Sequence, residues 1–155
     1  MVTDDTDPAA QGLAEQQLAE HSAKVMWSND AASRALGMEL VSVAPGRAVV
    51  TMTVRADMVN GWDVCHGGLI ASLADSAFAV ACNSRGQVTV ASGFDVTFLE
   101  SGRLGDVLVA TAEERALRGR SGLYDVTVRR RDDSGETVVA EFRGRSRSLG
   151  RPIEG

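Results

Sequence analysis

The sequence contains few of the residues that build covalent or metal-based scaffolds. It has two cysteines, Cys65 and Cys82, and only two histidines among 155 residues. Two cysteines cannot form the disulfide framework of a small secreted domain. Two histidines without suitably spaced cysteines do not provide the ligands of a zinc site. The sequence therefore predicts reduced thiols and no bound metal.

Long apolar runs and excess positive charge are also missing. The longest apolar stretch is about fourteen residues, short of the roughly twenty that a membrane-spanning helix needs. The N-terminus, M-V-T-D-D-T-D-P, carries acids where a secretory signal carries basic residues. A net charge of -5 gives no electrostatic reason to bind nucleic acid or an anionic membrane. These absences predict a cytoplasmic protein with no nucleic-acid or membrane partner.

The remaining composition is sufficient for one folded domain. A chain of 155 residues can bury one full hydrophobic core and is too short for two domains of ordinary size. We expect residues 1–10 to be a disordered leader and residues 149–155 to be a C-terminal tail. The single domain is then expected to span residues 11–148.

The spacing of apolar residues predicts the elements of this domain. Helical spacing predicts a helix over residues 11–26, followed by a short helix that is capped by Asn29 or Asp30 and stops at Gly37. Apolar residues then alternate over residues 48–54, which predicts a strand. The chain after residue 83 alternates again and predicts strands over residues 88–98, 105–117, 121–131 and 137–147.

Residues 66–83 separate these strands and differ from them in composition. Nearly every side chain in this stretch is small or apolar, which predicts a helix that is buried on most of its surface. Asp75 is the only acidic or basic side chain between His66 and Asn83. A carboxylate on a buried helix is costly unless it is hydrogen-bonded or used, so Asp75 is the leading candidate for a functional residue. One apolar helix and a meander of strands together predict an α+β fold in which a curled sheet wraps the helix.

The string H-G-G-L-I-A-S-L-A-D-S-A-F-A-V-A-C-N-S-R-G, which starts at His66, resembles the signature of hotdog-fold acyl-CoA thioesterases of the PaaI type, associated with phenylacetic acid degradation. The likeness continues through F-D-V-T-F-L-E-S-G-R-L-G-D-V-L-V-A-T-A, G-L-Y-D-V-T-V and F-R-G-R-S, and covers about residues 36–148. The resemblance implies a hotdog fold and a homodimer that joins two sheets, with two dimers paired into a homotetramer. It also implies hydrolysis of an acyl-CoA thioester to coenzyme A and a free acid, with no cofactor because coenzyme A is part of the substrate.

Two residues of the motif suit the chemistry of thioester hydrolysis. Gly67 is expected at the N-terminus of the buried helix, where a backbone N–H without an intrahelical partner can stabilise the oxyanion of the transition state. Glycine also lets the substrate carbonyl approach the backbone closely. Asp75 would act as a general base on water or attack directly to form a mixed anhydride, and the sequence does not decide between these two mechanisms.

The spacing of these two residues predicts a shared active site. Eight residues along a helix correspond to about 12 Å, whereas the donor and the base must both lie within about 3 Å of one small reacting group. We therefore expect Gly67 of one chain to face Asp75 of a two-fold mate, and the family resemblance implies the same arrangement.

Further residues on the loop before the helix match polar positions of the family. Asn60 would orient the carboxylate or the water, although Asn-Gly is also a turn dipeptide. His66 would fix the loop or lie near the thioester, and it would equally serve as a helix cap. Gly68 is expected to contact the substrate, and Trp62 would line the acyl pocket.

Two arginines are the candidates for binding coenzyme A. Arg118 and Arg120 flank a predicted turn and could reach the phosphates, while a solvated hairpin tip is the simpler interpretation. Cys82 follows Asp75 by seven residues on a similar helical face, and we expect it to fill the core.

The resemblance points to aryl-acetyl thioesters such as phenylacetyl-CoA or hydroxyphenylacetyl-CoA. Two alternatives come from the same fold: an acyl-CoA dehydratase and a non-catalytic acyl-CoA-binding module. A dehydratase of this fold typically places its histidine in an H-F-P context, whereas His66 is followed by Gly67 and Gly68. A binding module would not need an ionised Asp75.

Overall fold

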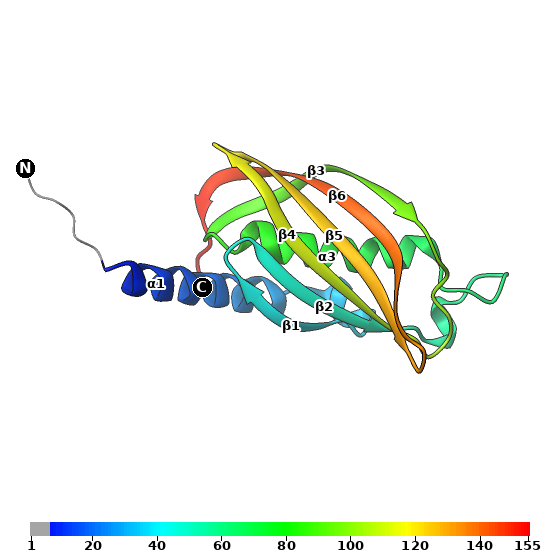
Figure 1. Cartoon of the computed structure of the whole chain (residues 1–155). Helices are drawn as coiled ribbons and strands as arrows, with labels where there is room; N and C mark the ends of the chain where they lie inside the picture. The colour runs from blue at the N-terminus through cyan, green and yellow to red at the C-terminus, as the bar shows by residue number, and fades with distance from the viewer. Residues whose placement is uncertain (1–6) are drawn as a thin grey trace, which may run out of the picture.

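The computed structural model describes residues 7–155, and most of this chain forms a curled sheet around one long helix (Figure 1). The six strands lie in the order β1-β2-β4-β5-β6-β3, and all neighbouring strands are antiparallel. They are β1 (Glu39–Ala44), β2 (Arg47–Thr53), β3 (Gln87–Phe98), β4 (Val107–Arg118), β5 (Ser121–Asp132) and β6 (Gly135–Pro152). The predicted α+β hotdog architecture is therefore confirmed.

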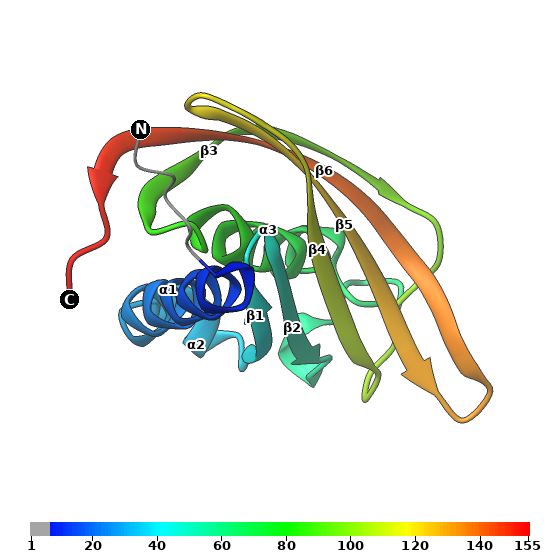
Figure 2. The ribbon, with the colours of Figure 1, turned by 60° about the vertical axis from the view of Figure 1, so that its left-hand side comes forward.

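The long helix α3 (Gly67–Asn83) lies against the concave face of the sheet (Figure 2). Leu73, Phe78 and Val80 are almost completely buried between the helix and the strands. Gly144 of β6 allows close packing here, because a Cβ at this position would lie 2.8 Å from the ring of Phe78. The predicted buried helix over residues 66–83 is confirmed, with His66 as its N-cap.

Helix α1 (Pro8–Ser28) begins earlier than the sequence analysis predicted. The side chain of Asp7 accepts a hydrogen bond from the Ala9 N–H, and proline suits the first turn of a helix because its missing N–H is not needed there. Residues 8–10, which were expected in a disordered leader, are therefore helical. The rest of that expected leader, residues 1–6, lies outside the described residues.

Helix α1 leads directly into α2 (Ala31–Ala35), which brings polar residues next to α3. Asp30 caps α2, and its carboxylate accepts a hydrogen bond from the Ser33 N–H at 2.9 Å. The chain then reverses at Gly37, whose φ of 66° favours glycine. The prediction of a short capped helix that stops at Gly37 is confirmed. No helix among residues 7–155 is long and apolar enough to cross a membrane.

Two strands differ from their predicted extents. The sequence analysis missed β1, an edge strand whose residues show no regular alternation of buried and exposed positions. β6 was expected to end at residue 147 and continues to Pro152, because Gln87 at the start of β3 pairs with that residue. Helix α1 therefore starts before residue 11, and β6 ends after residue 148. The domain bounds of 11–148 stay a prediction.

Strand β3 forms the other edge of the sheet and, among residues 7–155, pairs with β6 alone (Figure 1). The apolar alternation along residues 88–98 predicted one buried face. Val90, Phe94 and Phe98 are nevertheless 45%, 42% and 49% exposed, because nothing in the described part of this chain covers the free edge. A twelve-residue edge with unpaired backbone groups and exposed aromatic rings is a surface suited to pairing with another strand.

Candidate active site

Helix α3 starts from a loop that is anchored on both sides. The Cys65 N–H donates to the Gly102 carbonyl at 2.7 Å, and the His66 N–H donates to the Met58 carbonyl at 2.8 Å. The Nδ1 atom of His66 accepts a hydrogen bond from the Gly68 N–H at 3.0 Å. In a neutral imidazole the proton is then on Nε2, which points away from the cap and remains available as a donor. His66 therefore caps the helix, which is one of the two roles expected from the sequence.

Gly67 is the first residue of α3, as the sequence analysis expected. Its N–H donates to no other described residue, because the first N–H groups of a helix have no intrahelical acceptor and the His66 cap binds Gly68. A Cβ at Gly67 would lie 3.0 Å from the ring of Phe98. The free donor therefore lies beside an aromatic ring, at a position where only glycine fits without displacing that ring.

Asp75 is the central residue of α3, and its side chain is half-buried. It lines an open hollow of about 270 Å³ between α3 and the α2 segment, together with residues that include Asp30, Ser33, Ser72 and Ser76. Burial raises the pKa of Asp75, and no positively charged described residue lies close enough to oppose that effect. A carboxylate without a cation is a stronger base than one in an ion pair.

Asn60 and Trp62 lie on the loop that precedes α3. The Asn60 side-chain oxygen accepts hydrogen bonds from the N–H groups of Trp62 at 2.9 Å and Val64 at 3.4 Å. Asn60 therefore shapes the turn, which was the alternative to a role beside Asp75. Trp62 is 87% exposed. The loop before α3 projects from the body of the molecule (Figure 1).

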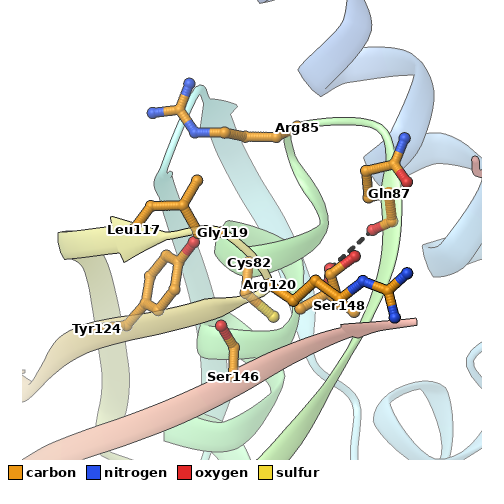
Figure 3. Close-up of a pocket in the computed structure, with 10 residues that line it drawn as sticks. Cys82, Arg85, Gln87, Leu117, Gly119, Arg120, Tyr124, Ser146 and Ser148 are labelled. Atoms are coloured by element: carbon orange, nitrogen blue, oxygen red, sulfur yellow. Dashed lines mark hydrogen bonds between the residues drawn. The ribbon is translucent and has the colours of Figure 1, made fainter. Parts of the chain in front are cut away.

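Arg118 and Arg120 lie at the far end of α3 from Gly67, on the turn between β4 and β5. Arg118 donates from Nη1 to the Leu117 carbonyl at 2.9 Å and is exposed. Arg120 lines a separate small cavity of about 80 Å³ (Figure 3). Within one protomer, the structure does not bring either arginine to the N-terminus of the helix.

The small cavity around Arg120 has a floor of core residues. Cys82 and Tyr124 line it together with Ser146 and Ser148 (Figure 3). Burial raises the pKa of the Cys82 thiol to about 12, so this thiol is protonated and unreactive at neutral pH. The expectation that Cys82 fills the core agrees with this environment.

The hollow around Asp75 contains polar residues that the sequence analysis did not single out. Ser33 and Ser76 come from different helices and lie 2.9 Å apart, oxygen to oxygen. Asp30 was predicted only as a possible helix cap. Ser76 follows Asp75 directly on a mostly apolar helix, which was the one signal available in the sequence. The link to Ser33 joins positions 43 residues apart and has no local signature.

Comparison with known proteins agrees with this site. Residues 63–137 match the model of the thioesterase superfamily. The chain is 46% identical over 134 residues to the acyl-coenzyme A thioesterase PaaI of Escherichia coli K12, covering 86% of this chain and 94% of that protein. The solved structure of E. coli PaaI, from the phenylacetic acid degradation operon, superposes with a TM-score of 0.85 over 90% of this chain and 99% of the other.

Two further solved structures extend the comparison. A mutant of the phenylacetic acid degradation protein PaaI from Thermus thermophilus is 38% identical, with a TM-score of 0.70 over 76% of this chain and 97% of that one. The smu.793 protein of Streptococcus mutans, solved bound to acetyl CoA, is 26% identical, with a TM-score of 0.70 over 75% and 91% of the two chains. These likenesses favour a thioesterase over a dehydratase or a binding module. The chain belongs to the PaaI-type acyl-CoA thioesterases of the thioesterase superfamily.

Proposed function

We propose that this thioesterase hydrolyses aryl-acetyl-CoA thioesters at an active site shared between two protomers. The observation that carries the proposal is the position of Gly67 and Asp75 on one helix, eight residues apart. This spacing corresponds to about 12 Å at about 1.5 Å per residue, which is too far for both groups to act on one carbonyl. A second copy of the chain must then supply one of the two groups.

The free edge of β3 supports a dimer with the required geometry. Gly67 lies against Phe98 at the end of β3. The other end of α3 is tied to the start of β3, because the Asn83 side chain exchanges two hydrogen bonds of 2.9 Å with the backbone of Thr89. Two-fold pairing of β3 strands is antiparallel and brings opposite ends together. Gly67 of one protomer would then lie alongside α3 of the other, and the register of the two β3 strands would set how close it comes to Asp75 at the centre of that helix.

The hydrolysis follows from these two groups. The Gly67 N–H would donate to the thioester oxygen as it becomes negative, and the helix dipole favours that charge. With Asp75 as general base, the carboxylate takes a proton from water while the water oxygen bonds to the carbonyl carbon. The tetrahedral intermediate then expels the coenzyme A thiolate, which accepts a proton to become the free thiol.

Direct attack by Asp75 is the other mechanism open to this site. The carboxylate oxygen would bond to the carbonyl carbon, the C–S bond would break, and water would hydrolyse the resulting anhydride. A single turnover in H₂¹⁸O distinguishes the two mechanisms. General-base attack puts ¹⁸O into the released acid, whereas water attack on the aspartyl carbonyl of an anhydride puts ¹⁸O into Asp75, where peptide mass spectrometry would find it.

The preference for an aryl-acetyl group rests on the relatives and on Phe98. E. coli PaaI comes from the phenylacetic acid degradation operon, and the S. mutans relative binds acetyl CoA. In this chain the half-exposed ring of Phe98 lies beside the Gly67 donor, where it would offer an aromatic wall to the acyl group. The reaction needs no cofactor, and two dimers would pair into a tetramer.

Mixing two inactive variants tests the shared site. Asp75→Asn removes the base. Gly67→Ala keeps the backbone N–H but puts a methyl group 3.0 Å from the ring of Phe98, where it would hinder close approach of the substrate carbonyl. If the site is shared, a mixed dimer contains one site with an intact glycine and an intact aspartate, and thiol release returns when the two inactive proteins are unfolded and refolded together. If both groups act within one chain, every site keeps one defect and the mixture stays inactive. The double variant, refolded alone, controls for residual turnover.

A panel of thioesters tests the substrate class. We expect kcat/KM for phenylacetyl-CoA and hydroxyphenylacetyl-CoA to exceed that for acetyl-CoA and octanoyl-CoA. Replacement of Phe98 by leucine should lower the aryl-acetyl values and leave the straight-chain values within about twofold, since it removes a ring and keeps apolar bulk. Higher kcat/KM for octanoyl-CoA would contradict the aryl-acetyl assignment.

A further inference from the structure

The hollow that contains Asp75 also contains a chain of three polar side chains that the proposed chemistry does not use. Ser33 is 2% exposed, and its hydroxyl lies 2.6 Å from the Oδ2 atom of Asp30 and 2.9 Å from the hydroxyl of Ser76. All three residues line the same hollow as Asp75. A buried serine joined to a carboxylate on one side and to a second hydroxyl on the other forms a hydrogen-bond chain with a defined direction.

The direction of this chain follows from the number of hydroxyl protons. A carboxylate only accepts hydrogen bonds, so the single hydroxyl proton of Ser33 is donated to Asp30 at 2.6 Å. Ser33 can then only accept from Ser76, whose own proton must point toward Ser33. The lone pairs of the Ser76 oxygen therefore face the hollow. Asp30 thus makes Ser76 an acceptor.

We infer that Ser76 holds the attacking water together with Asp75, and that Asp30 and Ser33 are positioning residues that keep Ser76 in its accepting state. A water molecule in the hollow would donate one proton to Asp75 and the other to Ser76. With both protons engaged by acceptors, its lone pair is left to point at the thioester carbon. This inference rests on the proposed function in its general-base form, in which Asp75 takes a proton from the attacking water.

The geometry of α2 explains why the hydrogen-bond chain from Ser76 through Ser33 to Asp30 keeps one donor-to-acceptor direction. Asp30 caps α2 and accepts from the Ser33 N–H as well as from its hydroxyl, so two hydrogen bonds fix the carboxylate. Ser33 is buried, so bulk water does not compete for its proton. By contrast, the hydroxyl of Ser72, in the same hollow, donates back to the Gly68 carbonyl at 2.8 Å as a helical serine commonly does. The proton of Ser72 is therefore held by its own helix, and no residue of α2 orients it.

The first test replaces Ser76 and measures kcat and KM separately with phenylacetyl-CoA. Ser76→Ala should lower kcat about tenfold, the effect of one lost hydrogen bond to the water, with KM changed less than twofold. Ser76→Thr keeps the hydroxyl and should recover most of kcat. Ser72→Ala removes a hydroxyl from the same hollow and should lower kcat much less than Ser76→Ala. Equal losses for Ser72→Ala and Ser76→Ala, or no recovery with threonine, would overturn the inference.

The second test reverses the donor-to-acceptor direction of the hydrogen-bond chain without removing the N-cap of α2. Asparagine caps helices as well as aspartate does, so Asp30→Asn should leave the melting temperature nearly unchanged. Its amide can donate to Ser33, which frees the Ser33 proton to point at Ser76 and turns Ser76 into a donor. We expect kcat to fall about as far as in Ser76→Ala, and the double variant to lose no more than either single one.

If the losses of kcat in the two single variants add up in the double variant, Asp30 and Ser76 act independently. That result would reject the proposed hydrogen-bond chain. Wild-type protein without thiol release would reject the proposed function itself. An active wild type with unaffected Ser76 and Asp30 variants would reject only this inference.

Discussion

Two carboxylates of this protein have opposite surroundings. Asp125, on the outer face of the sheet, accepts hydrogen bonds from Arg143 at 2.7 Å and 2.9 Å and from Arg115 at 2.8 Å, and these arginines hold its pKa below the usual range. Asp75, in the hollow between α3 and α2, has no cation among the described residues, and burial raises its pKa. Asp75 therefore lacks the ion pairs that stabilise the charged form of Asp125.

The largest expected effect comes from removing the isolated carboxylate. Asp75→Asn should lower kcat about a thousandfold, within the range for loss of a general base, with a smaller effect on KM. Because the variant no longer buries an unpaired charge, its melting temperature at pH 7 should be equal to or above that of the wild type. Thiol-release kinetics and thermal unfolding measure the two effects. Similar kcat values for the two proteins would remove Asp75 from the mechanism.

A second change would make Asp75 resemble Asp125. Ala79 lies one helical turn after Asp75 and lines the same hollow, so Ala79→Arg places a guanidinium within reach of the carboxylate. The ion pair lowers the basicity of Asp75, and we expect kcat to fall about tenfold through this effect. The acid limb of the kcat/KM profile should move to lower pH. Ala79→Met adds similar bulk without charge, and it should leave that limb in place.

The pH dependence of the wild type separates the two carboxylates further. Asp75 must be ionised to act, and its raised pKa means that it takes up a proton at a higher pH than an ordinary aspartate. Activity should therefore fall on the acid side at a pH above the ordinary aspartate value of about 3.9. Asp30 and Cys82 are the other titratable groups near Asp75, and the thiol stays protonated in this range. Asp75→Asn should lose this limb.

Stability should respond to pH with opposite sign at the two sites. A raised folded pKa contributes stability that is present at low pH and lost as pH rises through that pKa. A lowered folded pKa, as at Asp125, contributes stability that is lost as pH falls through it. Lowering the pH should therefore reduce the melting-temperature advantage of Asp75→Asn over the wild type, because Asp75 becomes neutral. It should also reduce the stability deficit of Asp125→Asn, because the wild type then loses the ion pairs of Asp125.

The smallest effect is expected at Asp125. Asp125→Asn removes a largely solvent-exposed ion-pair network and should lower the free energy of unfolding by about 1 kcal/mol at pH 7, with kcat within twofold of the wild type. Urea denaturation measures this change. A loss of activity comparable to that of Asp75→Asn would mean that pairing with arginine does not distinguish structural from functional acids in this protein.

The sequence was enough to predict the buried helix, the isolated acid and most of the strands, because each leaves a periodic signal in a short window. It did not reveal β1, whose exposed edge position imposes no alternation. It also missed Ser33, because the contact with Ser76 depends on how α2 packs against α3. Arg118 and Arg120 were predicted by the charge of a turn, and sequence alone could not show how far that turn lies from Gly67.

The attachment of both ends of α3 to a single strand has a consequence for assembly. Gly67 lies against Phe98, and Asn83 is hydrogen-bonded to Thr89, so each end of the helix is attached to β3. If two copies joined with their strands slipped by two residues, each helix would shift by roughly 7 Å along its mate. By symmetry, both proposed pairs of Gly67 and Asp75 would separate together. A dimer with the wrong strand register would then be fully inactive rather than half-active. Enzyme activity would therefore indicate that the two strands are paired in the correct register.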